Sequence, residues 1–183
     1  NGTVEWSFAD WGPKEGKWAN IAPNTPLYKD GKIFFCHGYN INGVMLQLSD
    51  DLKSVSVVWR TDVLDTHHGG YVEVNGTIYG SNWINNNQGN WCAIDWNTGA
   101  KGYETTWTGG KGKGSIIAAD GMLYCYDERR GAVALVNPDP AKFDIVSEFR
   151  ITKGVGPHWA HPVIVNGVLY IRHGFALMAY KVK

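Results

Sequence analysis

The segment Tyr71-Val72-Glu73-Val74-Asn75-Gly76-Thr77-Ile78-Tyr79 decides the fold, because it places Asn-Gly between two runs of strand-forming residues. A type I′ turn needs positive φ at both central residues, which Asn-Gly and Asp-Gly adopt readily, so the segment predicts a tight β-hairpin. The motif recurs at intervals of 45, 45 and 46 residues. Its four copies are Asp30-Gly31, Asn75-Gly76, Asp120-Gly121 and Asn166-Gly167. A fixed period of this length indicates a repeat architecture.

Each repeat continues beyond its hairpin. Third strands are predicted at 44–48, 91–95, 133–136 and 176–180, and fourth strands that end on an aromatic residue at 56–59, 104–107 and 146–149. Four short antiparallel strands in about 45 residues match one blade of a propeller. The sequence therefore predicts an all-β chain, with one β-propeller domain over 1–183 built from four-stranded antiparallel blades. The blades are expected at about 18–59, 66–107, 113–150 and 158–183.

The composition excludes several function classes. The chain has 17 basic and 17 acidic residues and a formal net charge of zero, so it lacks the basic footprint of a protein that binds nucleic acid or an anionic membrane. No apolar stretch approaches the roughly 20 residues of a membrane-spanning helix, and no signal peptide is visible. We therefore expect neither nucleic-acid binding nor membrane insertion.

The three cysteines are expected to be small buried hydrophobic residues rather than disulfide partners or metal ligands. They are Cys36, Cys92 and Cys125.

The two ends of the chain are out of phase with the repeats. Residues 1–8 resemble a fourth strand that carries Trp6, while the last repeat has only three predicted strands. Two arrangements fit this pattern. In a closed ring of four blades, residues 1–8 complete the last blade and remove its exposed edge. Alternatively, the four repeats are consecutive blades of a larger ring, completed by a missing half or by a second copy.

The repeats resemble a known family. Residues 93–99 read Ala-Ile-Asp-Trp-Asn-Thr-Gly and are followed by Trp107, which is similar to the tryptophan-docking repeats of the pyrroloquinoline quinone (PQQ) dehydrogenase-like β-propellers. The copies at 47–59 and 134–149 are degenerate versions of the same motif. The resemblance implies an eight-bladed ring of which four repeats are half, and we favour that arrangement. It also implies an exported protein of the bacterial periplasm or outer envelope.

Four aromatic residues at the ends of the predicted fourth strands are expected to be structural. A large ring wedged between neighbouring blades buries on the order of 150–250 Å², and an indole N–H can donate to a backbone carbonyl there. The predicted docking residues are Trp6, Trp59, Trp107 and Phe149.

The segments that precede the first strand of each blade form the candidate binding site, which we call the funnel. They lie at 20–25, 66–70, 111–115 and 156–161, and they are rich in Gly and His. Glycine allows close backbone approach, while His, Lys, Ser and Trp supply hydrogen bonds and a stacking face. The candidate ligand-binding residues are Trp18, His67, His68, Lys113, Ser115, His158, Trp159 and His161.

Three interpretations of the funnel remain open at the level of sequence. Its histidines can hydrogen-bond neighbouring blades around a water-filled channel, bind a ligand, or hold a metal ion through His67, His68, His158 and His161. We expect no metal, because no carboxylate or cysteine joins the cluster and because His67 and His68 point to opposite faces of an extended segment.

Catalysis is not the expected function. The resemblance implies that a PQQ dehydrogenase has adjacent cysteines, a Glu/Asn pair that holds Ca²⁺ and an Asp base. This chain has no Cys-Cys, and only Asp62 and Asp65 lie near the funnel, although Lys113 and Trp159 suit the carboxylate-binding and stacking roles. The predicted function is therefore a non-catalytic propeller that binds an unidentified small molecule or protein. The alternatives are part of a PQQ-dependent dehydrogenase, with PQQ and Ca²⁺ as cofactors, and an envelope assembly scaffold.

Overall fold

The computed structural model describes residues 1–10 and 21–182, which contain fifteen β-strands in four antiparallel sheets. The first sheet contains β1 (Leu27–Lys29), β2 (Lys32–Cys36), β3 (Gly43–Leu48) and β4 (Val55–Thr61). The second contains β5 (Tyr71–Val74), β6 (Thr77–Ser81), β7 (Trp91–Asp95) and β8 (Lys101–Thr105). The third contains β9 (Gly114–Ala119), β10 (Met122–Asp127), β11 (Ala132–Asn137) and β12 (Asp144–Arg150). The last contains β13 (Val163–Val165), β14 (Val168–His173) and β15 (Ala176–Lys181).

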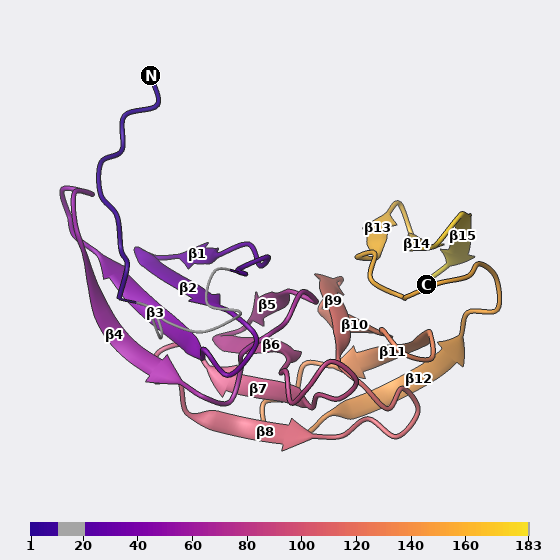
Figure 1. The fold of residues 1–183 in the computed structure, drawn as a ribbon. Helices are drawn as coiled ribbons and strands as arrows, with labels where there is room; N and C mark the ends of the chain where they lie inside the picture. Colours follow the sequence, from indigo (N-terminus) through magenta and orange to yellow (C-terminus); the bar gives the residue numbers. More distant parts are fainter. Residues whose placement is uncertain (11–20, 183) are drawn as a thin grey trace.

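Each sheet is one blade, with its strands paired in chain order. Figure 1 shows the four blades side by side in an open arc, with β1, β5, β9 and β13 on the inner side and β4, β8 and β12 on the outer side. The predicted propeller of antiparallel blades is confirmed, and its four repeats do not close into a ring. Within the two described ranges, no helix has the length and apolar character needed to cross a membrane.

The four hairpin turns have the predicted conformation. The first turn residues Asp30, Asn75, Asp120 and Asn166 have φ between 49° and 52°, and the glycines that follow have φ between 71° and 83°. Positive φ at both central positions defines the type I′ turn, whose twist matches that of the flanking strands. The turns therefore fix the strand register of every blade.

The hydrophobic core lies between the blades. Along β10, Leu123 and Cys125 pack toward the second blade, whereas Tyr124 and Tyr126 pack toward the fourth. Successive side chains of a strand point to opposite faces of its sheet, so one strand contributes to two cores. The first and second blades share a third cluster, which includes Phe34 and Ile94. A blade with a neighbour on both faces consequently buries side chains on both faces of its strands.

The three cysteines confirm their predicted role. Cys36, Cys92 and Cys125 are unpaired and buried. Burial raises the pKa of the Cys36 thiol to about 12 and raises those of the other two well above the usual value. These thiols remain protonated at neutral pH and pack as small apolar groups.

Trp59 and Trp107 lie at blade boundaries. The Trp59 indole donates to the Trp96 carbonyl oxygen in the next blade, at 3.3 Å, and its ring lies so close to Gly99 that a Cβ there would come within 2.7 Å. Trp107 is 1% exposed and donates to a carboxylate oxygen of Glu148 in the third blade, at 2.9 Å. The sequence predicted that Trp107 ends the fourth strand, but it lies two residues beyond the end of β8. There its indole turns toward the neighbouring blade.

Phe149 also crosses a boundary, because its ring centroid is 4.8 Å from that of Tyr180 in the fourth blade. The predicted strand over 1–8 is wrong: these residues form no strand, and Trp6 is half-buried. Phe8 packs edge-on against Phe35 in the first blade at 6.4 Å. Figure 1 shows the physical reason, since the last blade, which these residues would complete in a closed four-bladed ring, lies at the opposite end of the arc.

Candidate functional site

Hairpin geometry gathers polar side chains at one end of the blades. In an antiparallel hairpin the beginning of the first strand lies beside the end of the second, as Gly114 lies opposite Asp127. The position seven residues after the first turn residue is therefore next to the funnel segments. It is buried and polar in all four blades, where it is occupied by His37, Asn82, Asp127 and His173. We call these four residues the inner rim.

A buried ion pair lies beside the inner rim. Lys113, which is 2% exposed, precedes β9, and its ammonium group contacts the Glu128 carboxylate directly. The same ammonium donates to the carbonyl oxygens of Asn85, at 3.2 Å, and Asn86, at 3.0 Å. All three hydrogens of the Lys113 ammonium are thus engaged within the protein. This lysine has no remaining donor for a cofactor carboxylate, which is the role the family resemblance suggested.

His68 occupies the other side of the Glu128 carboxylate. His68 Nε2 lies 3.0 Å from Glu128 Oε2, and its side chain is 21% exposed. Burial alone would raise the pKa of Glu128, but the hydrogen bonds from His68 and Lys113 outweigh it and hold that pKa below its usual value. Glu128 is therefore ionised, and its two carboxylate oxygens are shared between Lys113 and His68.

His67 faces the same cluster. Its ring centroid is 4.6 Å from that of His68, and its Nε2 pairs with the Tyr39 hydroxyl at 2.8 Å. The Nδ1 atom is buried and has no hydrogen-bond partner among the described residues. Burial, with a smaller contribution from the positive charges of His68 and Lys113, lowers the pKa of His67 to about 4. His67 is neutral at pH 7.

The funnel segment of the fourth blade, residues 156–161, also contacts this cluster. His161 Nε2 donates to the His68 carbonyl oxygen at 2.9 Å, and the Trp159 ring meets the His68 ring edge-on at 5.4 Å. Trp159 is 57% exposed and offers an accessible aromatic face. Gly70 has φ of 69°, and a Cβ there would approach the His161 ring to 3.0 Å, so glycine suits both the turn and the contact.

His158 has a different environment. Its ring stacks on His173 at 3.7 Å, and its Nδ1 pairs with the Tyr126 hydroxyl at 2.6 Å. Burial, assisted by the charge of His173, lowers the pKa of His158 to about 4.

Two candidate residues remain. Ser115, on β9, is 1% exposed, and its hydroxyl has no partner among the described residues. Trp18, the remaining candidate, lies outside the described residues.

A pocket of 260 Å³ opens beside this cluster and is lined by residues from all four blades. Asn24, His68 and His161 contribute to its wall. The Asn24 amide donates to the carbonyl oxygens of Thr66, at 2.7 Å, and His67, at 3.2 Å, and accepts from Gly70 N at 3.2 Å. One side chain from the first blade thus fixes the His67–His68 loop against the pocket.

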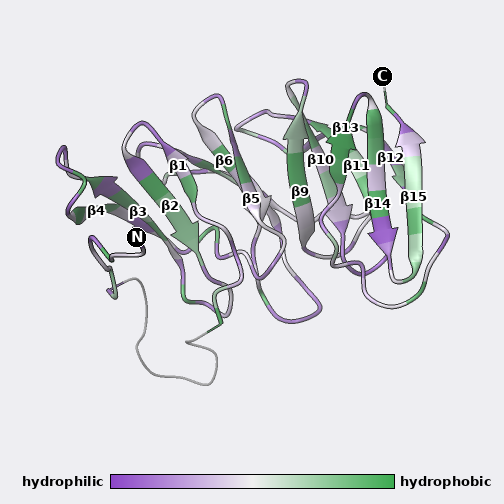
Figure 2. Ribbon diagram, turned by 90° about the horizontal axis from the view of Figure 1, so that it is seen from above, coloured by the Kyte–Doolittle hydropathy of each residue, from purple (hydrophilic) through white to green (hydrophobic). Residues whose placement is uncertain are grey.

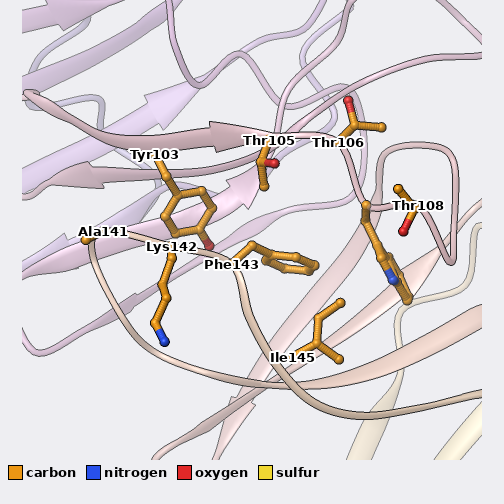
Figure 3. Close-up of a pocket in the computed structure, with 9 residues that line it drawn as sticks. Tyr103, Thr105, Thr106, Thr108, Ala141, Lys142, Phe143 and Ile145 are labelled. Atoms are coloured by element: carbon orange, nitrogen blue, oxygen red, sulfur yellow. The ribbon is translucent and has the colours of Figure 1, made fainter.

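A second pocket, of 360 Å³, lies at the outer side of the boundary between the second and third blades. Figure 3 shows Tyr103 and Phe143 in its wall, with Lys142 at its edge. The Lys142 ammonium pairs with Asp144 at 3.0 Å, and burial raises the pKa of Tyr103 far above its usual value. This pocket therefore offers aromatic and hydroxyl contacts rather than acid–base chemistry.

The structure contradicts both reasons for excluding a metal ion from the funnel. A carboxylate does join the histidines, because Glu128 follows β10 and reaches His68. The rings of His67 and His68 lie together rather than on opposite faces, because the chain bends here and forms no strand. His158 and His161 do not belong to this group of His67, His68 and Glu128.

Glu128 and the inner rim were missed in the sequence because only the segments before the first strands were considered. The signal was present, since a polar residue follows each turn at the same interval.

Asp65 was noticed in the sequence but given no role. It is 3% exposed and accepts the backbone N–H groups of Asn40 and Trp83, each at 3.0 Å, while burial raises its pKa to about 6.

Comparison with known proteins supports the fold. No family model matches the chain, and no curated protein sequence matches it. Among solved structures, the chain is similar to BamB from Moraxella catarrhalis, with a TM-score of 0.65 and 12% identity over 89% of this chain and 47% of BamB. It is also similar to a europium-containing methanol dehydrogenase, with a TM-score of 0.55 and 16% identity over 80% of this chain and 26% of the enzyme.

The chain thus spans about half the length of BamB and about a quarter of that of the dehydrogenase. At these identities the likeness concerns the fold, which a binding protein and an enzyme can share. Together with the hairpin period and the blade topology, it shows that the chain has the β-propeller fold.

Proposed function

We propose that this chain is a non-catalytic binding propeller whose ligand, a small polar molecule with a planar group, occupies the pocket beside His68 and His161. One observation carries the proposal: Lys113, the group that suits a cofactor carboxylate, is already engaged inside the protein, whereas the accessible ring of Trp159 lies against His68, which is part of the pocket wall. Lys113 illustrates the point, since Glu128 and two carbonyl oxygens take its three hydrogens. A planar ligand group can stack on Trp159 while the pocket wall supplies hydrogen bonds.

The alternatives come from the fold. Methanol dehydrogenase has a similar fold and suggests an oxidoreductase, and BamB suggests an assembly scaffold. In either case we propose an exported protein whose end blades are covered by a second copy of the chain or by further blades. Exposed apolar side chains on the fourth blade support this pairing, among them Phe175 and Leu177, which are 84% and 70% exposed.

The pocket is tested by a fragment screen followed by NMR of the tryptophan indole N–H signals, with the Trp159 signal assigned from a Trp159→Phe variant. We expect planar polar fragments to shift the Trp159 signal, and His161→Ala to weaken that binding. Trp83, whose ring packs on Tyr39 rather than on the pocket residue His68, serves as the matched control. Fragments that shift the indole signals without preference for Trp159, or that bind the His161→Ala variant equally well, would contradict the proposal.

A further inference from the structure

We propose that His67, His68 and Glu128 form a binding site for a divalent transition-metal ion, with Zn²⁺ as the best match to the donor set. One ligand atom from each residue lies within 4.8 Å of the others. Two imidazole nitrogens and one carboxylate oxygen are donors that zinc accepts in proteins. Ligand atoms on a tetrahedral zinc ion are about 3.3 Å apart. Binding therefore requires a small inward movement of these side chains.

The hydrogen bonds around the three residues leave the right atoms available. Tyr39 occupies His67 Nε2, so the buried Nδ1, which has no partner in the described ranges 1–10 and 21–182, is the nitrogen left for an ion. His68 Nε2 and Glu128 Oε2 face each other at 3.0 Å, and an ion between them would replace that contact. Within the part of the chain that the structure describes, no group outside the cluster pairs with these three atoms.

Further contacts hold the ligands in place from behind. Tyr39 fixes the ring of His67, and Lys113 holds the second oxygen of Glu128. Hydrogen bonds of this kind orient metal ligands and raise affinity. Lys113 also has an opposing effect, because its positive charge repels a cation bound to the same carboxylate. This charge favours a hydroxide or another small anion at the open coordination position.

The position of the cluster gives the ion a structural consequence. His67 and His68 lie in the connection between β4 and β5, whereas Glu128 directly follows β10 in the third blade. A bound ion would tie the connection between the first two blades to the third. The inference does not depend on a ligand in the neighbouring pocket, and its test uses Zn²⁺ alone.

The first experiment titrates chelator-treated protein with Zn²⁺ by isothermal calorimetry at pH 7.5 in a non-chelating buffer. We expect one site per chain with a micromolar or lower Kd. At a free zinc concentration of 100 times Kd, the melting temperature should rise by about 5–10 °C. Co²⁺ should give the visible absorption of a four- or five-coordinate site. The absence of saturable Zn²⁺ binding would overturn the proposal and leave the cluster as an ion-pair network.

Two histidine variants test whether Zn²⁺ binds at this cluster or at histidines elsewhere in the protein. His68→Gln should weaken Zn²⁺ binding by at least about tenfold, whereas His158→Gln, outside the cluster, should leave the affinity unchanged. His68 is partly exposed, so its replacement is compatible with folding. Equal affinity of wild type and His68→Gln, or equal losses in the two variants, would overturn the assignment.

Lys113→Met provides a test of opposite sign. Removing the competing ammonium should tighten zinc binding at least several-fold while lowering the melting temperature of the metal-free protein, because Glu128 then loses a buried partner. We expect the loss of charge repulsion to outweigh the loss of the orienting hydrogen bond, so an unchanged or weaker affinity in a folded Lys113→Met variant would contradict the placement of the ion on Glu128. If this variant does not fold, His68→Gln and His158→Gln still decide the question.

Discussion

The second and fourth blades share an Asn-Gly hairpin turn but have different surroundings. Every residue of β6 is buried in the second blade, which has a neighbour on each face, whereas half-buried and exposed positions alternate along β15 in the fourth blade. Figure 2 shows apolar residues along strands at both ends and in the middle of the arc, so hydropathy alone does not distinguish them. The burial of a blade in this fold is therefore determined by the neighbouring blades that pack against it.

The largest expected effect tests the boundary between the second and third blades. Trp107→Ala removes a ring that is 1% exposed and leaves the Glu148 carboxylate without its indole donor. We expect a loss of about 3–5 kcal/mol in the free energy of unfolding, measured by urea denaturation. Phe149→Ala is the matched control at the next boundary, where the ring is 39% exposed, and should cost about 1–2 kcal/mol. Equal losses would remove the distinction between the two boundaries.

A smaller effect is expected from His158, at the boundary of the fourth blade. Its native pKa of about 4 is below the ordinary value, so between pH 6.5 and 4 the unfolded chain binds a proton more readily than the native protein. The stabilising contribution of neutral His158 is therefore present above pH 6.5 and is lost as the pH falls toward 4. His158→Gln lacks this titration.

The measurement compares the melting temperatures of wild type and His158→Gln at several values between pH 7.5 and 4.5. Acidification should lower the wild-type melting temperature more than that of the variant. Asp65 and Asp127, whose pKa values burial raises to about 6, change stability in the opposite direction, but they are present in both proteins and cancel in the difference. A difference that does not change with pH would show that His158 does not titrate as the structure indicates.

The smallest effect on stability is expected on the exposed face of the fourth blade. Replacing both Phe175 and Leu177 with Ser should change the free energy of unfolding by no more than about 0.5 kcal/mol, because both side chains are already exposed. The same change should lower self-association, so that light scattering gives the monomer mass of 20.3 kDa. A wild-type protein with an identical mass would contradict the proposed pairing with a second copy.

Local chemistry explains why so much of the fold was predictable. Asp-Gly and Asn-Gly dictate the turn, and the turn sets the register of the strands on both sides. The aromatic residues at 59, 107 and 149 were likewise recognisable, and each contacts the next blade. Residues 1–8 were misjudged because a strand also needs an edge to pair with, and their composition does not reveal where that edge lies.

The candidate site was predictable only in part. His67, His68, Lys113 and His161 were identified, and the structure brings them together. Glu128 was missed because it follows a different strand and reaches the cluster only when the blades stack. Its pairing with Lys113 also changes the interpretation of that lysine, from a ligand-binding group to one half of a buried ion pair.

The most direct test of the account is a titration of the purified chain with PQQ in the presence of Ca²⁺, followed by tryptophan fluorescence and by the absorbance of the quinone. Because Glu128, Asn85 and Asn86 already engage Lys113, we predict no stoichiometric complex and no reduction of the quinone when an alcohol is added. A one-to-one complex in which the alcohol reduces the quinone would contradict the assignment as a non-catalytic binding propeller.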